Sequence, residues 1–189
     1  RPRRSRDPRR GTGLNTPPGP VPALRPATNA DIDALAELWH AGWREAHVGH
    51  VPTALLPHRT LAAFRARLPD IVTTVTVATN PTNVHDPDQP VGFVRVRDDE
   101  LEQMYVAADQ RGTGTAAALI AHAEHVIGVR YPAAWLAVVA GNARARRFYQ
   151  RSGWVDTGPF DEPAWLPDGT TLAVPCHRYE KPVASPSPR

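Results

Sequence analysis

The sequence predicts one α+β domain, α/β in the broad sense, in which helices flank a mixed, mostly antiparallel central sheet. Three observations lead to this prediction. Strand-like and helical segments follow one another in the order β-α-α-β-β-β-α-β-α-β-β. Two alternating segments, VGFVRVR and LEQMYVA, are joined by a tight turn, as expected of an antiparallel pair. A continuous apolar run, AAWLAVVA, is typical of a central strand that is covered on both faces.

The chain of 189 residues is expected to form a single domain, which we place at residues 23–181. Residues 1–22 are rich in arginine and proline, and we expect them and residues 182–189 to be disordered tails. The first ten residues hold six arginines and one aspartate, so the net charge of +3 belongs to this tail and not to the body. The tail is either a solvated extension or an arm for nucleic acid. We expect no nucleic-acid partner.

Several other classes of function are not expected from the composition. No apolar run approaches the ~20 residues that a membrane span requires, so we expect no membrane partner. The single Cys176 excludes a disulfide within the chain and favours a cytoplasmic location. This cysteine lies in the strand-like segment LAVPCHRY, which favours a core or edge position over a nucleophile. His122 and His125 lack the companions of a zinc motif, so no metal is expected.

The first half of the domain begins with a short strand at residues 23–28 and a helix at residues 31–48. The apolar residues of this helix that keep helical spacing are Ile32, Leu35, Leu38, Trp39 and Ala46. A second helix is expected at residues 59–68, where Pro69 would end it. The β-branched segment at residues 71–79 then predicts a strand.

The second half contains two more helices with clear terminal signals. One follows the glycine turn at residues 112–114 and ends near Val129, and the other begins at Asn142 and ends at the C-cap Gly153. The remaining strands are expected at residues 91–97, 101–107, 133–140, 154–158 and 170–181. The turn between the last two strands is predicted at Pro167-Asp168-Gly169.

The segment DQRGTGTAAALIAHAE, residues 109–124, places a glycine turn at the start of a helix, where anions commonly bind. A P-loop is excluded because no lysine follows the glycines. A dinucleotide-binding fingerprint matches residues 112–117, but it should open the first strand–helix–strand unit, and several strands precede it here. The third interpretation is a pyrophosphate site made of free backbone amides, with Arg111 adding a charged contact.

A second motif lies downstream, in the segment GNARARRFYQRSGW. Its pattern is N-x-x-A-x-x-F-Y-x-x-x-G-W, filled by Asn142, Ala145, Phe148, Tyr149, Gly153 and Trp154. Together with ELEQMYVAADQRGTGTAAALI, this segment resembles the GNAT superfamily of N-acetyltransferases, and the resemblance extends over residues 24–181. One position departs from the family pattern: Asp109 stands where the loop often has glutamine or arginine, and Gln110 and Arg111 are displaced by one and two positions.

The resemblance implies acetyl-CoA as the cosubstrate. Its pyrophosphate would lie on the amides of residues 111–116, and its pantetheine arm would lie between the strands that end at Val106 and Val139, with Met104 and Val106 as backbone partners. The cofactor-binding residues implied in this way are Met104, Tyr105, Val106, Arg111, Gly112, Thr113, Gly114, Thr115, Ala116, Asn142, Ala145 and Tyr149. Asn142 would bond the cofactor, cap its helix, or do both.

Two residues are candidates for catalysis. By resemblance, Tyr149 would donate a proton to the departing thiolate. Alternatively, Tyr149 is a core residue, since Ala145, Phe148 and Ser152 lie on the same helix face. Glu102 would accept the proton of the amine, directly or through a water, because it lies two residues before Met104 and so on the same strand face. A solvated edge carboxylate is the alternative for Glu102.

The resemblance implies that the first two helices and the last two strands flank the acceptor site. The helix face opposite the core stripe carries His40, Trp43, Arg44 and His47, which would bind an acidic or aromatic acceptor or simply form a solvated face. The resemblance implies an N-acetyltransferase that transfers an acetyl group directly to a primary amine of a small molecule or a protein, as a monomer or homodimer. Two alternatives stay open, a non-catalytic CoA-binding sensor or scaffold of the same fold and an NADP-dependent oxidoreductase.

Overall fold

The computed structural model describes residues 22–183 of the chain. The predicted basic tail at residues 1–22 lies almost entirely outside the described residues, and so does most of the second tail. At the C-terminal end, the last strand continues to Pro182, and Val183 is buried in the core. The folded domain thus extends slightly beyond the expected limit at Lys181.

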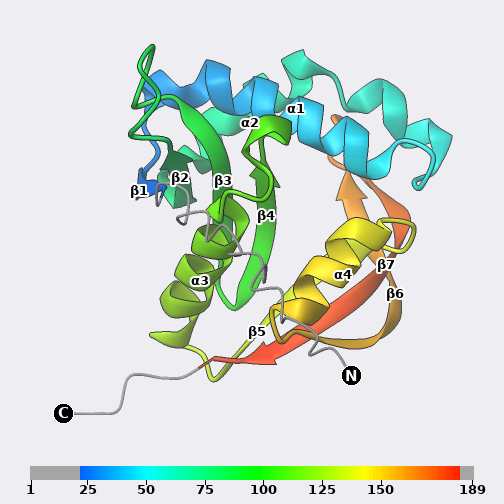
Figure 1. Ribbon diagram of the computed structural model, residues 1–189. Helices are drawn as coiled ribbons and strands as arrows, with labels where there is room; N and C mark the ends of the chain where they lie inside the picture. Colours follow the sequence, from blue (N-terminus) through cyan, green and yellow to red (C-terminus); the bar gives the residue numbers. More distant parts are fainter. Residues whose placement is uncertain (1–21, 184–189) are drawn as a thin grey trace, which may run out of the picture.

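The elements follow the predicted order (Figure 1). The α-helices within residues 22–183 are α1 (Ile32–His47), α2 (Leu61–Ile71), α3 (Thr115–Gly128) and α4 (Ala143–Arg151). The strands of the same region are β1 (Ala23–Pro26), β2 (Val75–Thr79), β3 (Pro90–Arg97), β4 (Glu100–Val106), β5 (Ala133–Val139), β6 (Val155–Trp165) and β7 (Thr171–Pro182). The predicted α+β class is confirmed.

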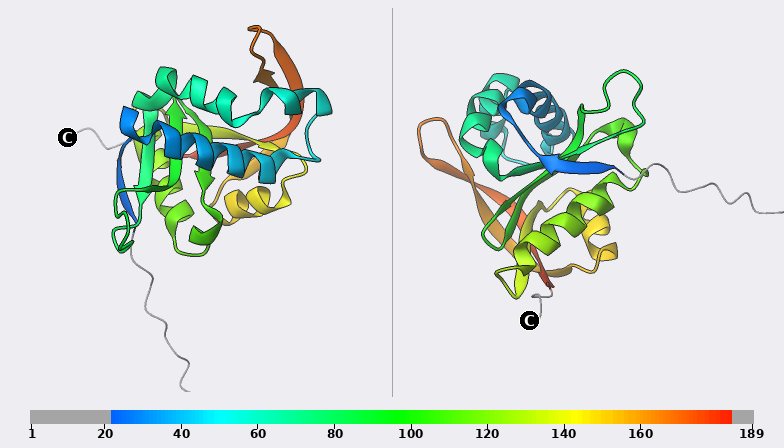
Figure 2. Two further views of the ribbon diagram at one scale, coloured as in Figure 1. Left: turned by 90° about the horizontal axis from the view of Figure 1, so that it is seen from above. Right: turned by 90° about the vertical axis from the view of Figure 1, so that its left-hand side faces the viewer.

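These strands form one sheet in the order β1-β2-β3-β4-β5-β7-β6. Every neighbouring pair is antiparallel except β4 and β5, which run parallel, so the sheet is mixed and mostly antiparallel as predicted. Helices α1 and α2 cover one face of the sheet, and α3 and α4 cover the other (Figure 2). The core therefore consists of two apolar layers, one on each side of the sheet.

Aromatic side chains build the layer between the sheet and the first two helices. Phe64 of α2 is 1% exposed, and its ring centroid lies 4.7 Å from that of Trp39 on α1. Trp43, one turn further along α1, is also buried, and its ring centroid lies 6.2 Å from that of Phe64. The prediction that Trp43 faces away from the core stripe is therefore wrong. Leu35, Trp39 and Trp43 follow one another at intervals of four residues and form one buried stripe.

Pro69 does not end α2, as the sequence predicted, but lies inside its last turn. A proline at this position removes only one backbone hydrogen bond, the one to the carbonyl of the exposed Arg65. Burial of Leu68 and Ile71 against the sheet favours continuation of the helix past it. Residues 72–74 then form a 3-10 turn, so the strand predicted at residues 71–79 begins only at Val75.

Replacing Phe64 with alanine should destabilise the fold by about 3–5 kcal/mol, because it removes a fully buried ring from the contact between α1 and α2. Urea unfolding followed by circular dichroism measures this change. Leu61→Ala on the same helix is the matched control, since Leu61 is 40% exposed and its truncation should cost less than about 1 kcal/mol. Equal losses in the two variants would contradict the assignment of Phe64 to the core.

Candidate active site

Strands β4 and β5 pair at a single position, where Glu100 lies opposite Trp135. The turn before β4 fixes this contact. The carbonyl of Asp99 accepts a hydrogen bond from Trp135 N at 3.0 Å, and the Asp99 carboxylate accepts one from the indole at 3.2 Å. Beyond this point the two parallel strands separate. A cavity of about 750 Å³ lies there, lined by residues of both strands and of the helices that follow them.

The edge of β4 that faces this gap presents unpaired backbone groups. Ala107 N donates a hydrogen bond to the carbonyl of Val91, the residue opposite it. Bonded and non-bonded pairs alternate along an antiparallel ladder, so Val106 and Met104 direct their N–H and C=O groups away from β3 and into the gap. Both residues line the cavity. They are the two residues that the resemblance implies as backbone partners of the cofactor.

The loop between β4 and α3 contains two glycines in the left-handed region. Gly112 has a φ of 77°, and Gly114, the N-cap of α3, has a φ of 94°. Within the described part of the chain, the amides of residues 112–117 have no backbone acceptor, and the first bond of the helix runs from Ala118 N to the Gly114 carbonyl. Free amides at a helix N-terminus are suited to accept an anion.

Arg111, the charged residue of this loop, is held by a carboxylate from α1. Glu45 forms ion pairs with Arg111 and with Arg144 at the start of α4, the latter at 2.6 Å. Their hydrogen bonds, that of Arg111 first, hold the pKa of Glu45 below its usual value despite partial burial. All three side chains are at least 40% exposed. An incoming phosphate can therefore replace Glu45 as the partner of both arginines at little cost.

Helix α4 presents Asn142 and Tyr149 to the cavity. Asn142 is the helix cap, since its Oδ1 accepts a hydrogen bond from Ala145 N at 3.1 Å, which leaves its amide N–H groups available. Tyr149 is 7% exposed, and its ring centroid lies 6.1 Å from that of Trp154. Burial raises the pKa of the Tyr149 hydroxyl. Tyr149 is thus a core residue that also reaches the cavity and stays protonated at neutral pH.

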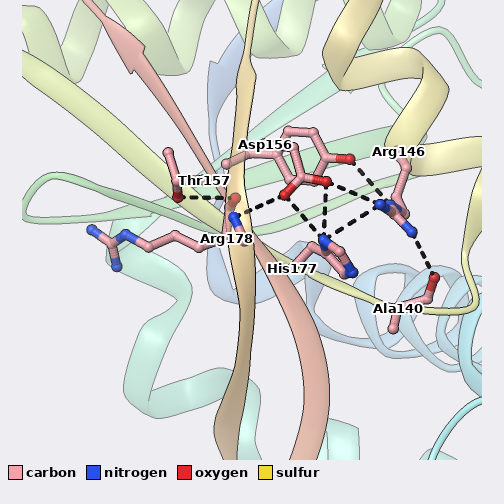
Figure 3. Close-up of polar contacts among 8 residues, drawn as sticks. Ala140, Arg146, Asp156, Thr157, His177 and Arg178 are labelled. Carbon is pink, nitrogen blue, oxygen red and sulfur yellow. Dashed lines mark hydrogen bonds and ion pairs between the residues drawn. The ribbon is translucent and has the colours of Figure 1, made fainter.

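A polar network from β6 and β7 holds the first turn of α4 in place (Figure 3). Arg146 donates to the Asp156 carboxylate at 2.9 Å and to the Tyr179 hydroxyl at 3.1 Å. A further bond from Arg146 reaches the carbonyl of Ala140 at 3.3 Å, and His177 Nδ1 lies 2.9 Å from Asp156. Burial opposes the charge of Asp156, but the hydrogen bonds from His177, a backbone amide and Arg146 outweigh it and lower its pKa to about 2. The network thereby fixes the helix that carries Asn142 and Tyr149.

A β-bulge in β4 changes the face on which Glu102 lies. The register between β3 and β4 skips Glu102, which is an extra residue on its strand. Its carboxylate forms an ion pair with Arg95, which lies two residues from Phe93 and so on the α1 and α2 side of the sheet. Met104 packs on the α3 side. The prediction that Glu102 shares a strand face with Met104 is therefore wrong, and its side chain, 14% exposed, is no solvated edge carboxylate.

Two of the four residues predicted for the acceptor, Trp43 and His47, line the cavity, whereas His40 and Arg44 do not. The His47 ring stacks on that of Trp43 with 4.8 Å between centroids, and its Nδ1 lies 2.9 Å from the Trp43 carbonyl. Burial lowers the pKa of His47 to about 4. His47 is therefore neutral at physiological pH and supplies no positive charge to an acceptor.

The cavity also receives side chains that sequence reasoning missed. Arg59 precedes α2, Arg67 lies within it, and Trp165 ends β6. The guanidinium carbon of Arg59 lies 3.9 Å from the Trp165 ring centroid. No local pattern signals this contact, because the two residues are 106 positions apart and meet only where the β6–β7 hairpin lies beside α2 (Figure 2).

In the described region, three features are absent: a reactive thiolate, a cluster of metal ligands and a membrane-spanning helix. Cys176 is buried and free, and burial raises the pKa of its thiol to about 12, so it is no thiolate nucleophile. Within residues 22–183, no three His, Cys, Asp or Glu side chains are grouped to hold a metal ion. In the same region, no helix is both long and apolar enough to cross a membrane.

Solved structures share this fold. A GCN5-related N-acetyltransferase from Rhodopseudomonas palustris aligns with a TM-score of 0.64 at 21% identity, over 86% of this chain and 96% of that one. YjaB from Escherichia coli aligns with a TM-score of 0.58 at 22% identity, over 85% and 97%. The PaiA N-acetyltransferase from Thermoplasma acidophilum, solved with coenzyme A, aligns with a TM-score of 0.56 at 15% identity, over 86% and 99%.

Sequence comparison identifies the family to which the chain belongs. A search of curated proteins gave no match. A sequence model of the acetyltransferase (GNAT) domain, in contrast, matches residues 63–168, which is more than half of the chain. The matched region contains β4, the glycine loop, β5 and α4, the elements that surround the cavity. The chain therefore belongs to the GNAT family of acetyltransferases.

Proposed function

We propose that the protein is an acetyl-CoA-dependent N-acetyltransferase that transfers an acetyl group directly to a primary amine. The observation that carries this proposal is the single-position pairing of β4 and β5, because it leaves an open strand edge that leads to an anion-binding helix N-terminus. A ligand with a pyrophosphate followed by an amide-containing arm fits both features. The loop amides suit the phosphates, and the free backbone groups of Met104 and Val106 suit the amides of the arm.

Bound acetyl-CoA would supply the acetyl group as a thioester. A free N–H of β4, that of Met104 or Val106, is available to stabilise negative charge on the thioester oxygen. Tyr149 keeps its proton because burial raises its pKa, and it would donate that proton to the sulfur as the carbon–sulfur bond breaks. Asn142 would bond the cofactor through the amide group that capping leaves free.

The amine has to lose a proton when its nitrogen bonds to the acetyl carbon. Glu102 is the proposed acceptor of this proton, directly or through a water, because the bulge turns its carboxylate toward the acceptor side of the cavity. One carboxylate oxygen pairs with Arg95, while the other lies 3.7 Å from Arg97, beyond hydrogen-bond distance. This second oxygen is the one available to take the proton.

We further propose a cytoplasmic location, because a free, buried thiol is typical of proteins in a reducing compartment.

Thermal-shift measurements with CoA, acetyl-CoA, NAD and NADP test the cofactor. CoA at a hundredfold excess over its dissociation constant should stabilise the fold by about 2.7 kcal/mol. A panel of primary amines, followed by the release of free thiol, then tests transfer. A CoA shift without thiol release from any amine would favour the non-catalytic sensor or scaffold, and a larger shift with NADP would refute the acetyltransferase.

Gly114→Val should abolish the thermal shift with CoA, because the β-branched side chain would occupy the phosphate position and oppose the left-handed backbone. The matched control is Gly169→Val in the β6–β7 turn, where φ is also left-handed, at 83°. The control introduces a similar backbone strain, about 1–3 kcal/mol, outside the cavity and should keep the CoA shift. Loss of CoA binding in both variants would attribute the effect to strain rather than to the phosphate position.

Tyr149→Phe should lower kcat by about 100- to 10,000-fold, because the variant loses the proton donor but keeps the buried ring. CoA affinity, measured by thermal shift, should stay nearly unchanged. Tyr131→Phe is the control: it removes a hydroxyl that bonds Asp98 away from the cavity, and it should keep full turnover. Unchanged turnover in Tyr149→Phe would assign this residue to the core alone.

A further inference from the structure

Arg59 is the one arginine among the buried residues of region 22–183, with 4% of its surface exposed. Its Nη2 donates to the Trp165 carbonyl at 2.7 Å. The guanidinium carbon lies 3.9 Å from the Trp165 ring centroid and 5.9 Å from that of Trp43. Two indole rings therefore hold the guanidinium in a fixed orientation at the wall of the cavity.

This buried cation has no carboxylate partner in the described part of the chain. The other buried charged residues are paired, Asp31 with an arginine at 2.8 Å and Glu100 with another at 2.6 Å. Within residues 22–183, Arg59 bonds only carbonyl oxygens, and the nearby Arg67 is a second cation. Burial, followed by Arg67, lowers the pKa of Arg59 to about 10, so the group is still charged at neutral pH.

A buried charge is unfavourable unless a counter-charge accompanies it. Arg67 lines the same cavity, with its guanidinium carbon 4.7 Å from the Trp165 ring centroid, and it too forms no ion pair within residues 22–183. A guanidinium has five N–H donors, and within residues 22–183 Arg59 uses two of them on carbonyls, so three are left there for a ligand. The wall between α2 and the β6–β7 hairpin thus offers a site for a planar anion.

The same cavity also carries carboxylates. Glu100, Glu102 and Glu162 line it, and burial raises the pKa of Glu162, with the charge of Glu100 adding to the effect. These acidic groups attract an incoming amine as its ammonium ion, which has to release one proton to water before its nitrogen attacks, in addition to the proton that Glu102 would take. They would repel a phosphate ester, with nearly two negative charges, more than a carboxylate with one. These carboxylates, together with Arg59 and Arg67, therefore match a molecule that carries one amine and one carboxylate.

We propose that Arg59, with Arg67 beside it, binds a carboxylate of the acceptor, so that the acceptor is an amine that also carries a carboxylate, such as an amino acid. The assignment rests on the proposed N-acetyltransferase function and names the substrate class of that site. An acidic acceptor would thus be recognised at the wall between α2 and β6, and not on the face of α1 that the sequence predicted. On α1, Arg44 does not line the cavity and His47 is neutral.

The test uses ω-amino acids from glycine to 6-aminohexanoate, each beside the n-alkylamine that lacks the carboxylate, with phosphoethanolamine as the phosphate probe. Dissociation constants for the full-length, CoA-saturated protein are measured by calorimetry, and kcat/KM is measured by thiol release. At the best chain length, the amino acid should bind about 10- to 100-fold more tightly than its alkylamine, the range expected for hydrogen bonds between charged groups.

Arg59→Gln should remove this advantage while leaving the binding of the alkylamine unchanged, and Arg67→Gln should reduce it by a smaller factor. Arg65→Gln is the matched control, because Arg65 lies on α2 like Arg67 but is 62% exposed and pairs with Asp33. The CoA thermal shift reports the folding of each variant. If Arg59→Gln does not fold, two measurements decide the outcome: the binding of amino acids against alkylamines by the wild-type protein, and the same binding by Arg67→Gln.

Equal binding of amino acids and alkylamines by the wild-type protein would overturn the inference, as would an equal loss of both in Arg59→Gln. Tighter binding of phosphoethanolamine than of every amino acid would overturn the choice of a carboxylate. The proposed function fails in a different way. Carboxylate-dependent binding through Arg59 without thiol release would support the anion site and refute acetyl transfer to these amines.

Discussion

The single contact between β4 and β5 is the constraint on which the site depends. The strands are held together at one end, where Trp135 donates hydrogen bonds to Asp99 from both its backbone amide and its indole. The guanidinium carbon of Arg178 lies 4.1 Å from the centroid of the same indole ring. The bulge at Glu102 follows directly, and a bulge increases local twist, which turns the rest of β4 away from its parallel neighbour. The separation leaves an unpaired strand edge inside the domain, an arrangement that a bound ligand can complete.

Arginine side chains lie at both ends of the cavity, but they are exposed at one end and buried at the other. At the mouth, Arg111 and Arg144 are exposed and share Glu45, and an ion pair of this kind exchanges its anion readily. Helix α1 brings Glu45 there because Gly42, one turn earlier, lies against the ring of Tyr105, where a side chain would collide. At the inner wall, Arg59 is buried and has no carboxylate partner within residues 22–183, so its charge is less well solvated than those of Arg111 and Arg144.

Much of this architecture could be predicted from the sequence, because it depends on local signals. The order of the elements follows from hydrophobic periodicity, which needs no knowledge of the partner. The glycine loop and the Asn142 cap follow from what the backbone requires at a helix N-terminus. The two motifs identified the surroundings of the cavity, including Met104 and Tyr149, although the roles of these residues are still predictions.

The sequence by itself determined the order of helices and strands and the glycine turn that precedes α3, since neighbouring residues encode both. Only the tertiary structure decided which side chains meet. A period of two assigns Glu102 to one face of its strand, but the register with β3 inserts a bulge and reverses that face. Trp43 is buried because α2 packs over it, and Arg59 meets Trp165 across 106 positions. Register, helix packing and the pairing of a buried charge depend on distant partners, so no local pattern specifies them.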